Sequence, residues 1–229
     1  MSPGQFHDLE SAVAAAVDRF VESIRAHDRA TGVHVGAIGA VAGVVARGLV
    51  DDGVVDPWTA EWVELVAPLH DVGKLEVPSR VLAKPSGLDA DEWAIVRQHP
   101  TIGRDRIASV LSELVVDLTA DDAGAVADIG PVIDLTAAVV ELHHETLDGR
   151  GYPHGLTGAE IPVAARIVAV ADVYDALTAV RPYKEAWTAR DAVGELSRMV
   201  DDGRLDPDCV AVLVRSTDEL DDLASRSSD

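Results

Sequence analysis

Histidines able to bind a metal gather at a few points of this sequence. The chain contains eight histidines, and several of them stand next to an aspartate or a glutamate. Imidazole and carboxylate groups together are typical ligands of first-row transition metals. Five histidines fall at expected helix ends or beside loop segments: His34, His70, His99, His143 and His144. A lone histidine is more often a surface or core residue than a ligand, so the distribution is more informative than any one of them.

The dipeptide His-Asp occurs three times, as His7-Asp8, His27-Asp28 and His70-Asp71. Only the third closes an apolar segment and leads at once into a backbone break at Gly73 and a cation at Lys74. We interpret the first two dipeptides as solvated residues and the third as a metal-binding pair.

The run His143-His144-Glu145 is a stronger signal, because adjacent histidines near a helix end can approach a pair of metal ions from neighbouring directions. The alternative is two surface histidines. The segment DGRGYP follows at residues 148–153, and its glycines would let the main chain come close to a ligand. This context favours the binding site.

A carboxylate lies inside the most apolar segment of the chain, residues 167–177. An unpaired Asp172 would be costly to bury there unless it met a metal or a cation. The alternative is that it pairs with Arg166 or Arg181, although Asp175 fits that structural role better.

Lysine is rare in this chain, and its positions support the same segments. The only lysines are Lys74, Lys84 and Lys184, against sixteen arginines. A compact ammonium group serves proton transfer and phosphate contact differently from a guanidinium group. This would explain the lysines at positions 74 and 184.

The elements that carry these residues are expected to be helices, since apolar residues recur at helical spacing and Ala and Leu are abundant. Prolines and glycines predict ordered loops over residues 73–87 and 145–162. Residues 113–131 show no clear pattern. The helices are expected over residues 9–27, 32–47, 57–70, 89–111, 131–144, 161–180, 188–201 and 207–220, with a break at Pro100 just after His99 in the fourth of them. The expected fold class is therefore all-α.

Charge and composition exclude several classes of protein. The formal net charge of -21 opposes binding of a long nucleic acid, which depends on basic side chains displacing counterions. A small phosphorylated ligand stays possible where bound metals reverse the local field. The single Cys209 excludes an internal disulfide. No secretion signal or membrane-spanning run is visible, so a cytoplasmic location is expected.

Three motifs together resemble the HD-GYP family of the HD hydrolase superfamily. They are HDVGK at residues 70–74, HHETLDGRGYP at 143–153 and DVYDALTAVRPYK at 172–184, in the order typical of that family. The resemblance implies an all-α, HD-type helical bundle with an ordered GYP loop. It further implies an N-terminal helical extension over residues 1–27, the HD-GYP domain over 28–220 and an acidic, disordered tail over 221–229.

The resemblance also implies a centre of two transition-metal ions, iron or manganese, with Asp71 bridging them. A glutamate that holds a third metal in some similar proteins is replaced here by Ala30, so we expect two metals. The implied ligands are His34, His70, Asp71, His99, His143, His144 and Asp172.

The implied activity is hydrolysis of cyclic di-GMP by a metal-activated hydroxide to linear pGpG, with further cleavage to GMP left open. Lys74 would donate a proton to the departing ribose oxygen, and Asp71 would act with the metals. Substrate contacts are expected from Arg181, Lys184, Asp148, Gly151 and Tyr152. The GYP loop is also an expected contact for a diguanylate cyclase (GGDEF) protein.

Two alternatives stay open. The chain could be a catalytically silent receptor or interaction module for a cyclic dinucleotide. It could also hydrolyse another nucleotide, such as cyclic GMP-AMP or a guanosine polyphosphate. About thirty N-terminal residues are too few for a sensor domain, so regulation through a partner or a homodimer is a further expectation.

Overall fold

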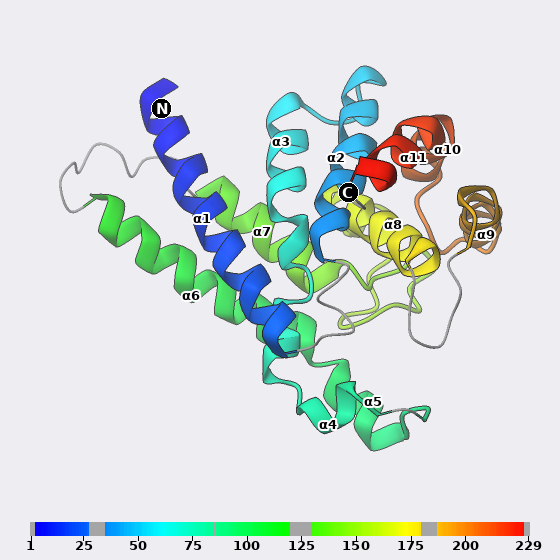
Figure 1. Cartoon of the computed structure of the whole chain (residues 1–229), viewed down its shortest axis with the longest axis horizontal. Coiled ribbons are helices and arrows are strands. Elements are labelled where there is room, and N and C mark those ends of the chain that lie inside the picture. Colours follow the sequence, from blue (N-terminus) through cyan, green and yellow to red (C-terminus); the bar gives the residue numbers. More distant parts are fainter. Residues whose placement is uncertain (1–2, 28–34, 85, 120–129, 180–186, 227–229) are drawn as a thin grey trace.

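The computed structural model describes residues 3–27, 35–84, 86–119, 130–179 and 187–226. Within these ranges the chain is helical, with one isolated bridge between Asp148 and Thr157 and no strand. The predicted all-α class is confirmed (Figure 1). The main helices are α1 (Pro3–His27), α2 (Val35–Asp51), α3 (Pro57–Val66), α6 (His99–Thr119), α7 (Gly130–Leu142), α8 (Val163–Thr178), α9 (Ala189–Asp201), α10 (Pro207–Arg215) and α11 (Thr217–Arg226). The short elements are η1 (Ala67–Leu69), η2 (Val72–Glu76), α4 (Ser79–Leu82), α5 (Ala90–Val96) and η4 (Gly158–Glu160).

Helices α2 and α8 form the centre of the hydrophobic core, and α3, α7, α9 and α10 pack around them. The apolar sequence of α8 explains its position, since nine of its sixteen residues are buried and a helix that is apolar on most faces must be enclosed. Its arginine, Arg166, forms an ion pair with Asp206 at the start of α10. Arg166 therefore pairs with Asp206 and not, as the alternative had it, with Asp172.

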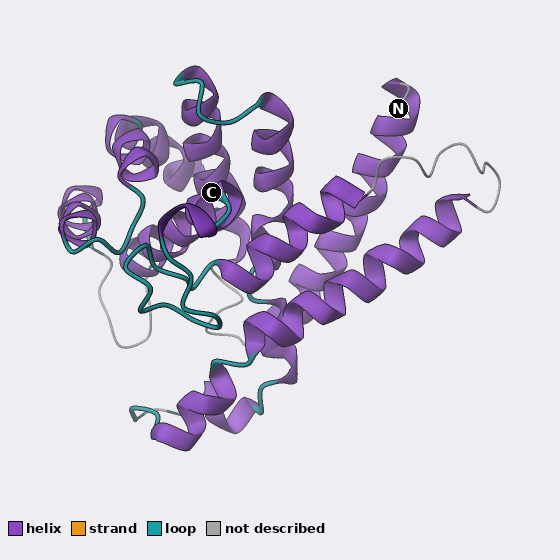
Figure 2. Cartoon of the chain, turned by 180° about the vertical axis from the view of Figure 1, so that it is seen from behind, coloured by secondary structure: helices purple, strands orange, loops and turns teal. Residues whose placement is uncertain are grey.

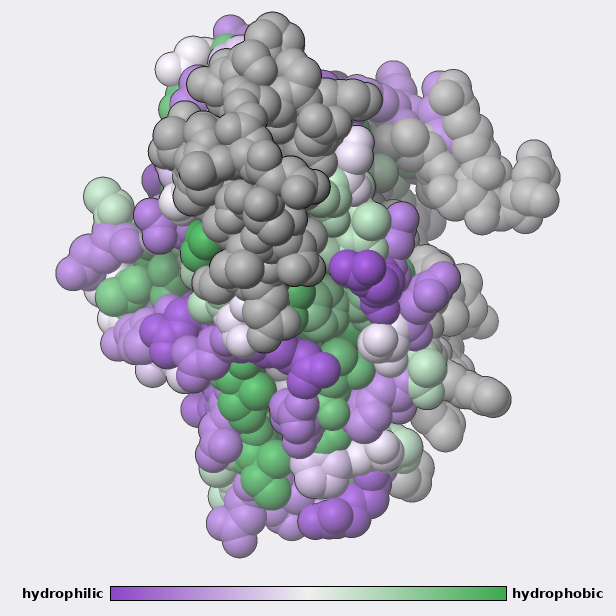
Figure 3. All heavy atoms as spheres, turned by 90° about the vertical axis from the view of Figure 1, so that its left-hand side faces the viewer, coloured by the Kyte–Doolittle hydropathy of each residue, from purple (hydrophilic) through white to green (hydrophobic). Residues whose placement is uncertain are grey.

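The N-terminal helix α1 packs onto the body of the domain. Val13, Val17 and Ile24 are buried in the main core, and α1 contacts η1, η2 and α6. Figure 2 shows α1 and α6 as two long helices on the same side of the molecule. Figure 3 views this side, where apolar surface appears in separate strips between polar side chains.

Helices α4 and α5 project from the bundle at the bottom of Figure 1. They enclose a small apolar cluster of their own, built on Val77, Val81 and Val96. A capping box starts α5, since Asp89 accepts a hydrogen bond from the Glu92 N–H and Glu92 accepts one from the Asp89 N–H. The segment 73–87 was predicted as an ordered loop, and the structure differs in that most of η2 and all of the single-turn helix α4 lie within it.

Prolines set two boundaries differently from the prediction. Helix α3 ends at Val66, and the 3-10 helix η1, which contains Pro68, replaces the last predicted turn. The break predicted at Pro100 falls instead before His99, between the end of α5 at Val96 and the start of α6 at His99. Pro100 lies in the first turn of α6. Proline fits there, since the first N–H groups of a helix have no internal partner.

The last predicted helix is two helices, which meet at Ser216. Asp206 caps α10 by accepting from the N–H groups of Asp208 and Cys209. Helix α11 continues to Arg226, into the segment for which the sequence predicted a disordered tail. No described helix is long and apolar enough to span a membrane.

Candidate metal centre

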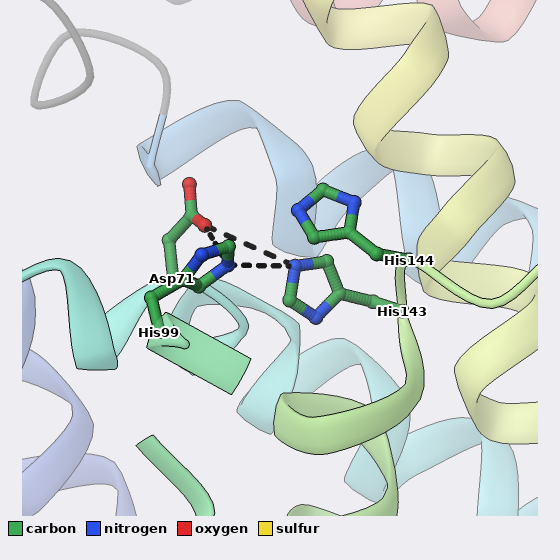
Figure 4. A group of neighbouring side chains, drawn as sticks. All are labelled: Asp71, His99, His143 and His144. Carbon is green, nitrogen blue, oxygen red and sulfur yellow. Dashed lines mark hydrogen bonds and ion pairs between the residues drawn. The ribbon is translucent and has the colours of Figure 1, made fainter. Parts of the chain in front are cut away.

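Four ligand-type side chains from three parts of the chain meet at one point (Figure 4). Asp71 lies between η1 and η2, His99 is the first residue of α6, and His143 and His144 follow the end of α7. One ligand atom of each lies within 4.8 Å of those of the others. Helix ends therefore bring together residues that are up to 73 positions apart in the chain.

Two glycines allow these helix ends to approach so closely. A Cβ atom on Gly73 would overlap the carbonyl oxygen of His99. A Cβ atom on Gly103 would lie 2.7 Å from Val140 Cγ1 and 3.1 Å from the nitrogen of Gly73. The absence of side chains at both positions therefore allows main-chain contact between η2 and α6 beside the cluster, and lets Val140 of α7 pack against Gly103.

The orientation of three imidazoles is fixed by the main chain. Nδ1 of His70 lies 2.9 Å from the carbonyl oxygen of Ala67, and Nδ1 of His99 lies 2.8 Å from that of Val96. Nδ1 of His143 lies 3.0 Å from the carbonyl oxygen of residue 140. A carbonyl only accepts, so each Nδ1 donates its proton, and in the neutral form of each ring Nε2 is the unprotonated nitrogen.

These Nε2 atoms converge on Asp71. Oδ1 of Asp71 lies 3.1 Å from Nε2 of His99 and 3.9 Å from Nε2 of His143, and the two nitrogens are 3.5 Å apart. All three atoms are acceptors, and Asp71 Oδ1 is buried without a hydrogen-bond partner. Acceptors buried against one another are costly unless a cation lies among them. The donor set thus fits a metal ion.

The second carboxylate oxygen of Asp71 faces different neighbours. Oδ2 lies 3.3 Å from Nε2 of His70 and accepts a hydrogen bond of 2.5 Å from Nζ of Lys74. Nε2 of His70 also lies 3.8 Å from Oδ1 of Asp172 on α8. The two oxygens of Asp71 therefore face two separate groups of ligand-type atoms.

Burial and charge set the protonation of the cluster. Burial lowers the pKa of His143 well below its usual value and that of His144 to about 3, so both rings are neutral. Burial also lowers the pKa of His70, but the carboxylates of Asp71 and Asp172 outweigh it and raise this pKa to about 8. Burial would raise the pKa of Asp71, yet Lys74 and His70 hold it well below its usual range. Neutral imidazoles and an ionised carboxylate are the forms that bind metals.

The GYP loop closes over His144. The Tyr152 ring lies 4.6 Å from the His144 ring, and the Tyr152 N–H donates to the carbonyl oxygen of His144. A Cβ atom on Gly151 would lie 2.6 Å from that same oxygen, so only glycine permits this approach. The carboxylate of Asp148 accepts hydrogen bonds from the Thr146 hydroxyl and the Arg150 N–H, within its own loop.

One buried residue that holds the loop beside the cluster was not among the predicted site residues. The buried carboxylate of Glu145 accepts hydrogen bonds from three consecutive main-chain N–H groups, those of His154, Gly155 and Leu156. It thereby ties the segment after the GYP motif to the end of α7. Its place directly after His143-His144 was the signal in the sequence that could have identified it.

Some predicted positions lie outside the described residues. These are His34, Arg181 and Lys184, together with Ala30. Lys74, Gly151, Tyr152 and the other predicted ligands are described and lie as stated above.

The fold and the cluster define a helical protein with a candidate metal centre of histidines and aspartates. Residues 41–209 match the family model described as HD domain. The chain belongs to this HD domain family. Its resemblance to the HD-GYP proteins, inferred from the motifs, is confirmed by the relatives described next.

Several curated proteins are similar to this chain. It is 36% identical over 225 residues to the cyclic di-GMP phosphodiesterase response regulator RpfG of Xanthomonas campestris pv. campestris, a match over 97% of this chain and 53% of that protein. It is 33% identical to the 3'3'-cGAMP-specific phosphodiesterase 2 of Vibrio cholerae, over 96% and 38% of the two chains. It is 34% identical to a cyclic di-GMP phosphodiesterase of Thermotoga maritima, over 88% and 49%. The chain thus spans about half the length of these relatives, or less.

Two solved structures share the fold. The HDG"Y"P protein Bd1817 from Bdellovibrio bacteriovorus matches with a TM-score of 0.54 and 21% identity, over 89% of this chain and 60% of that chain. The HD domain of the Listeria monocytogenes phosphodiesterase PgpH, solved in complex with cyclic-di-AMP, matches with a TM-score of 0.52 and 13% identity, over 90% and 96%. At these identities the likeness concerns the fold alone.

Proposed function

We propose that this chain is a metal-dependent phosphodiesterase that hydrolyses cyclic di-GMP to linear pGpG and GMP. The observation that carries the proposal is the buried, unpartnered Oδ1 of Asp71 facing the unprotonated Nε2 atoms of His99 and His143. The names of the similar proteins support the class of substrate, since they include cyclic di-GMP and cGAMP phosphodiesterases.

Two ions, iron or manganese, are the proposed metals, and Asp71 is the proposed bridge between them. Its two oxygens support this role because they face two different groups of ligand-type atoms. Bound there, such ions supply a Lewis acid and acidify a bound water. The full proposed ligand set is His34, His70, Asp71, His99, His143, His144 and Asp172.

Side chains of this protein are proposed to donate a proton to the leaving group and to bind the phosphates of the substrate. Lys74 is the proposed proton donor, and its Nζ already contacts Asp71 at the edge of the cluster, partly exposed to solvent. Arg181 and Lys184 are the proposed phosphate contacts. Tyr152 and Gly151 shape the site next to His144, while the hydrogen bonds of Asp148 support a role in shaping the loop.

Cyclic GMP-AMP is a second candidate substrate, favoured by the similarity to the Vibrio cholerae enzyme. A diguanylate cyclase that binds residues 148–153, a homodimer and a cytoplasmic location are proposed on the family resemblance.

The test is metal analysis of protein purified without oxygen, combined with turnover of cyclic di-GMP in the presence of iron or manganese. We expect about two metals per chain and loss of both metal and turnover in His70→Ala and Asp71→Ala. His7→Ala is the matched control, because its His-Asp dipeptide has the same sequence but belongs to the first turns of α1. A fully loaded protein that binds cyclic dinucleotides but turns over none of them would contradict the proposal and favour a receptor.

A further inference from the structure

Helix α5 presents an arginine and a tryptophan next to the candidate metal centre. Trp93 and Arg97 lie four positions apart, and residues at this spacing share one face of a helix. The indole of Trp93 is 47% exposed, which is unusual for so large an aromatic side chain. The chain continues from Arg97 to His99 with only one residue between them, so this face adjoins the cluster.

The guanidinium of Arg97 lies near two aromatic rings. Its Cζ atom is 5.9 Å from the centre of the Trp93 ring and 5.3 Å from the centre of the Tyr152 ring. The Tyr152 ring in turn lies 4.6 Å from that of His144. Trp93, Arg97, Tyr152 and His144 therefore form a row of flat groups that leads from exposed surface to a candidate metal ligand.

Arg97 differs from other exposed arginines in its aromatic contacts. Arg47, Arg104, Arg106, Arg198 and Arg215 each pair with a carboxylate. Arg97, like Arg80, Arg190 and Arg204, has no such ion pair within the described part of the chain, but its guanidinium lies near two aromatic rings. Its N–H donors are therefore held in place by aromatic contacts while they keep their capacity to bind a ligand.

We propose that Arg97 recognises the guanine base of the substrate, and that Trp93 holds the arginine and offers apolar area to the same base. This inference rests on the proposed function. Arginine donates to two acceptors of guanine, O6 and N7, whereas adenine presents an amino group in place of O6. Aromatic side chains and guanidinium planes are common stacking surfaces for bases. Arg97 is thus a specificity-determining residue that favours guanine over adenine.

The distances fit one small ligand. Two ring contacts, Arg97 to Tyr152 and Tyr152 to His144, separate the guanidinium from the cluster. A phosphate at the metal centre and a base at Arg97 can therefore belong to the same cyclic dinucleotide. The base is the part of the substrate that none of the predicted contacts recognises.

The test uses Arg97→Gln, with Arg106→Gln as matched control. Arg106 also lies over an aromatic ring, at 5.9 Å from that of Phe20, but its guanidinium pairs with the carboxylate of Glu76. For Arg97→Gln we expect the KM for cyclic di-GMP to rise about tenfold or more, as for loss of one bidentate base contact, with kcat little changed. Hydrolysis of bis(p-nitrophenyl) phosphate, which has no base, should be unchanged. Arg106→Gln should match wild type on both substrates.

A second variant and a binding measurement keep the inference testable if Arg97→Gln folds poorly. Arg97→Lys retains the charge but not the paired donors, so it should also lose the preference for cyclic di-GMP over cyclic di-AMP. That preference is measured by titrating the protein with each nucleotide and following tryptophan fluorescence. The Trp93→Phe variant identifies which part of the signal comes from Trp93.

The outcomes separate this inference from the function on which it rests. Wild-type protein that cleaves bis(p-nitrophenyl) phosphate but neither binds nor cleaves a cyclic dinucleotide would overturn both. Turnover of cyclic di-GMP with an unchanged KM and unchanged base preference in Arg97→Gln would overturn only the role of Arg97. An equal loss on both substrates would assign Arg97 a structural role and overturn the inference as well.

Discussion

At the scale of single residues, the properties of the cluster depend on where protons are held. The Nδ1 atoms of His70, His99 and His143 donate to main-chain carbonyls, which leaves their Nε2 atoms to face Asp71. Residue types and their neighbours predicted that these side chains belong together. The choice of ring nitrogen could not be predicted, because it depends on how each helix ends.

Metal-free protein is expected to lose stability as the pH falls below 6.5, the usual pKa of histidine, because burial lowers the pKa of His144 to about 3. The unfolded chain takes up this proton near pH 6.5, whereas the folded chain does not. The stabilising contribution is therefore present above pH 6.5 and is lost as the pH falls towards 3. The lowered pKa of His143 acts in the same direction.

His70 acts in the opposite direction. Its pKa is raised to about 8, so its contribution is complete below pH 6.5 and is lost as the pH rises through 8. Urea denaturation of metal-free protein across this range measures the balance. His144→Leu should show a weaker loss of stability in acid than wild type, and His7→Ala should not. Equal acid dependence in wild type and His144→Leu would contradict the assignment.

At the scale of elements, the ends of η2, α6 and α7 create the site by their close approach. Segment boundaries near His70, His99 and His143 could be predicted, because apolar periodicity stops at each. The contact between η2 and α6 could not, since it depends on Gly73 and Gly103, which sequence periodicity treats only as helix breakers. The same limit explains why η2 and α4 were predicted as loop.

Gly73→Ala is expected to destabilise the fold by more than about 2 kcal/mol, because the new Cβ overlaps the carbonyl oxygen of His99 and overpacking is costly. Metal content should fall with it, since His99 would be displaced from Asp71. Gly194→Ala in α9 is the matched control. A Cβ there meets nothing within 4 Å, so we expect a gain of about 0.5–1 kcal/mol. Thermal denaturation and metal analysis measure both effects, and an unaffected Gly73→Ala would exclude the proposed close packing.

Glu145→Ala is expected to free the segment after the GYP motif, because three main-chain N–H groups lose their acceptor. Leaving such groups unpaired costs about 1–3 kcal/mol each where they stay buried. Hydrogen exchange at His154, Gly155 and Leu156 should accelerate, and turnover should fall. Glu160→Ala is the control, since that carboxylate caps only the short helix η4 at the surface. Unchanged exchange in Glu145→Ala would show that the loop is held by other contacts.

At the scale of the whole molecule, the cluster lies in a strongly acidic protein that is proposed to bind an anionic ligand. The net charge of -21 directed the prediction away from long nucleic acids and left a small phosphorylated ligand possible. Composition could not indicate which cationic side chains surround the site where such a ligand would bind. The structure supports one answer, in which Lys74 lies beside Asp71 and Arg97 lies beside Tyr152.

Raising the ionic strength from about 0.01 M to about 0.15 M is expected to lower the KM for cyclic di-GMP by at least roughly twofold, because salt screens the repulsion between the acidic surface and the substrate. Short-range contacts at the metal centre are screened far less, so kcat should change little. Steady-state kinetics in a salt whose anion does not bind metals provides the measurement. Asp52→Asn together with Glu219→Gln, both exposed acidic residues, should reduce the salt effect slightly without altering kcat. A KM that rises with salt would instead show that Lys74, Arg97 and the bound metals dominate the field that the substrate meets on its approach.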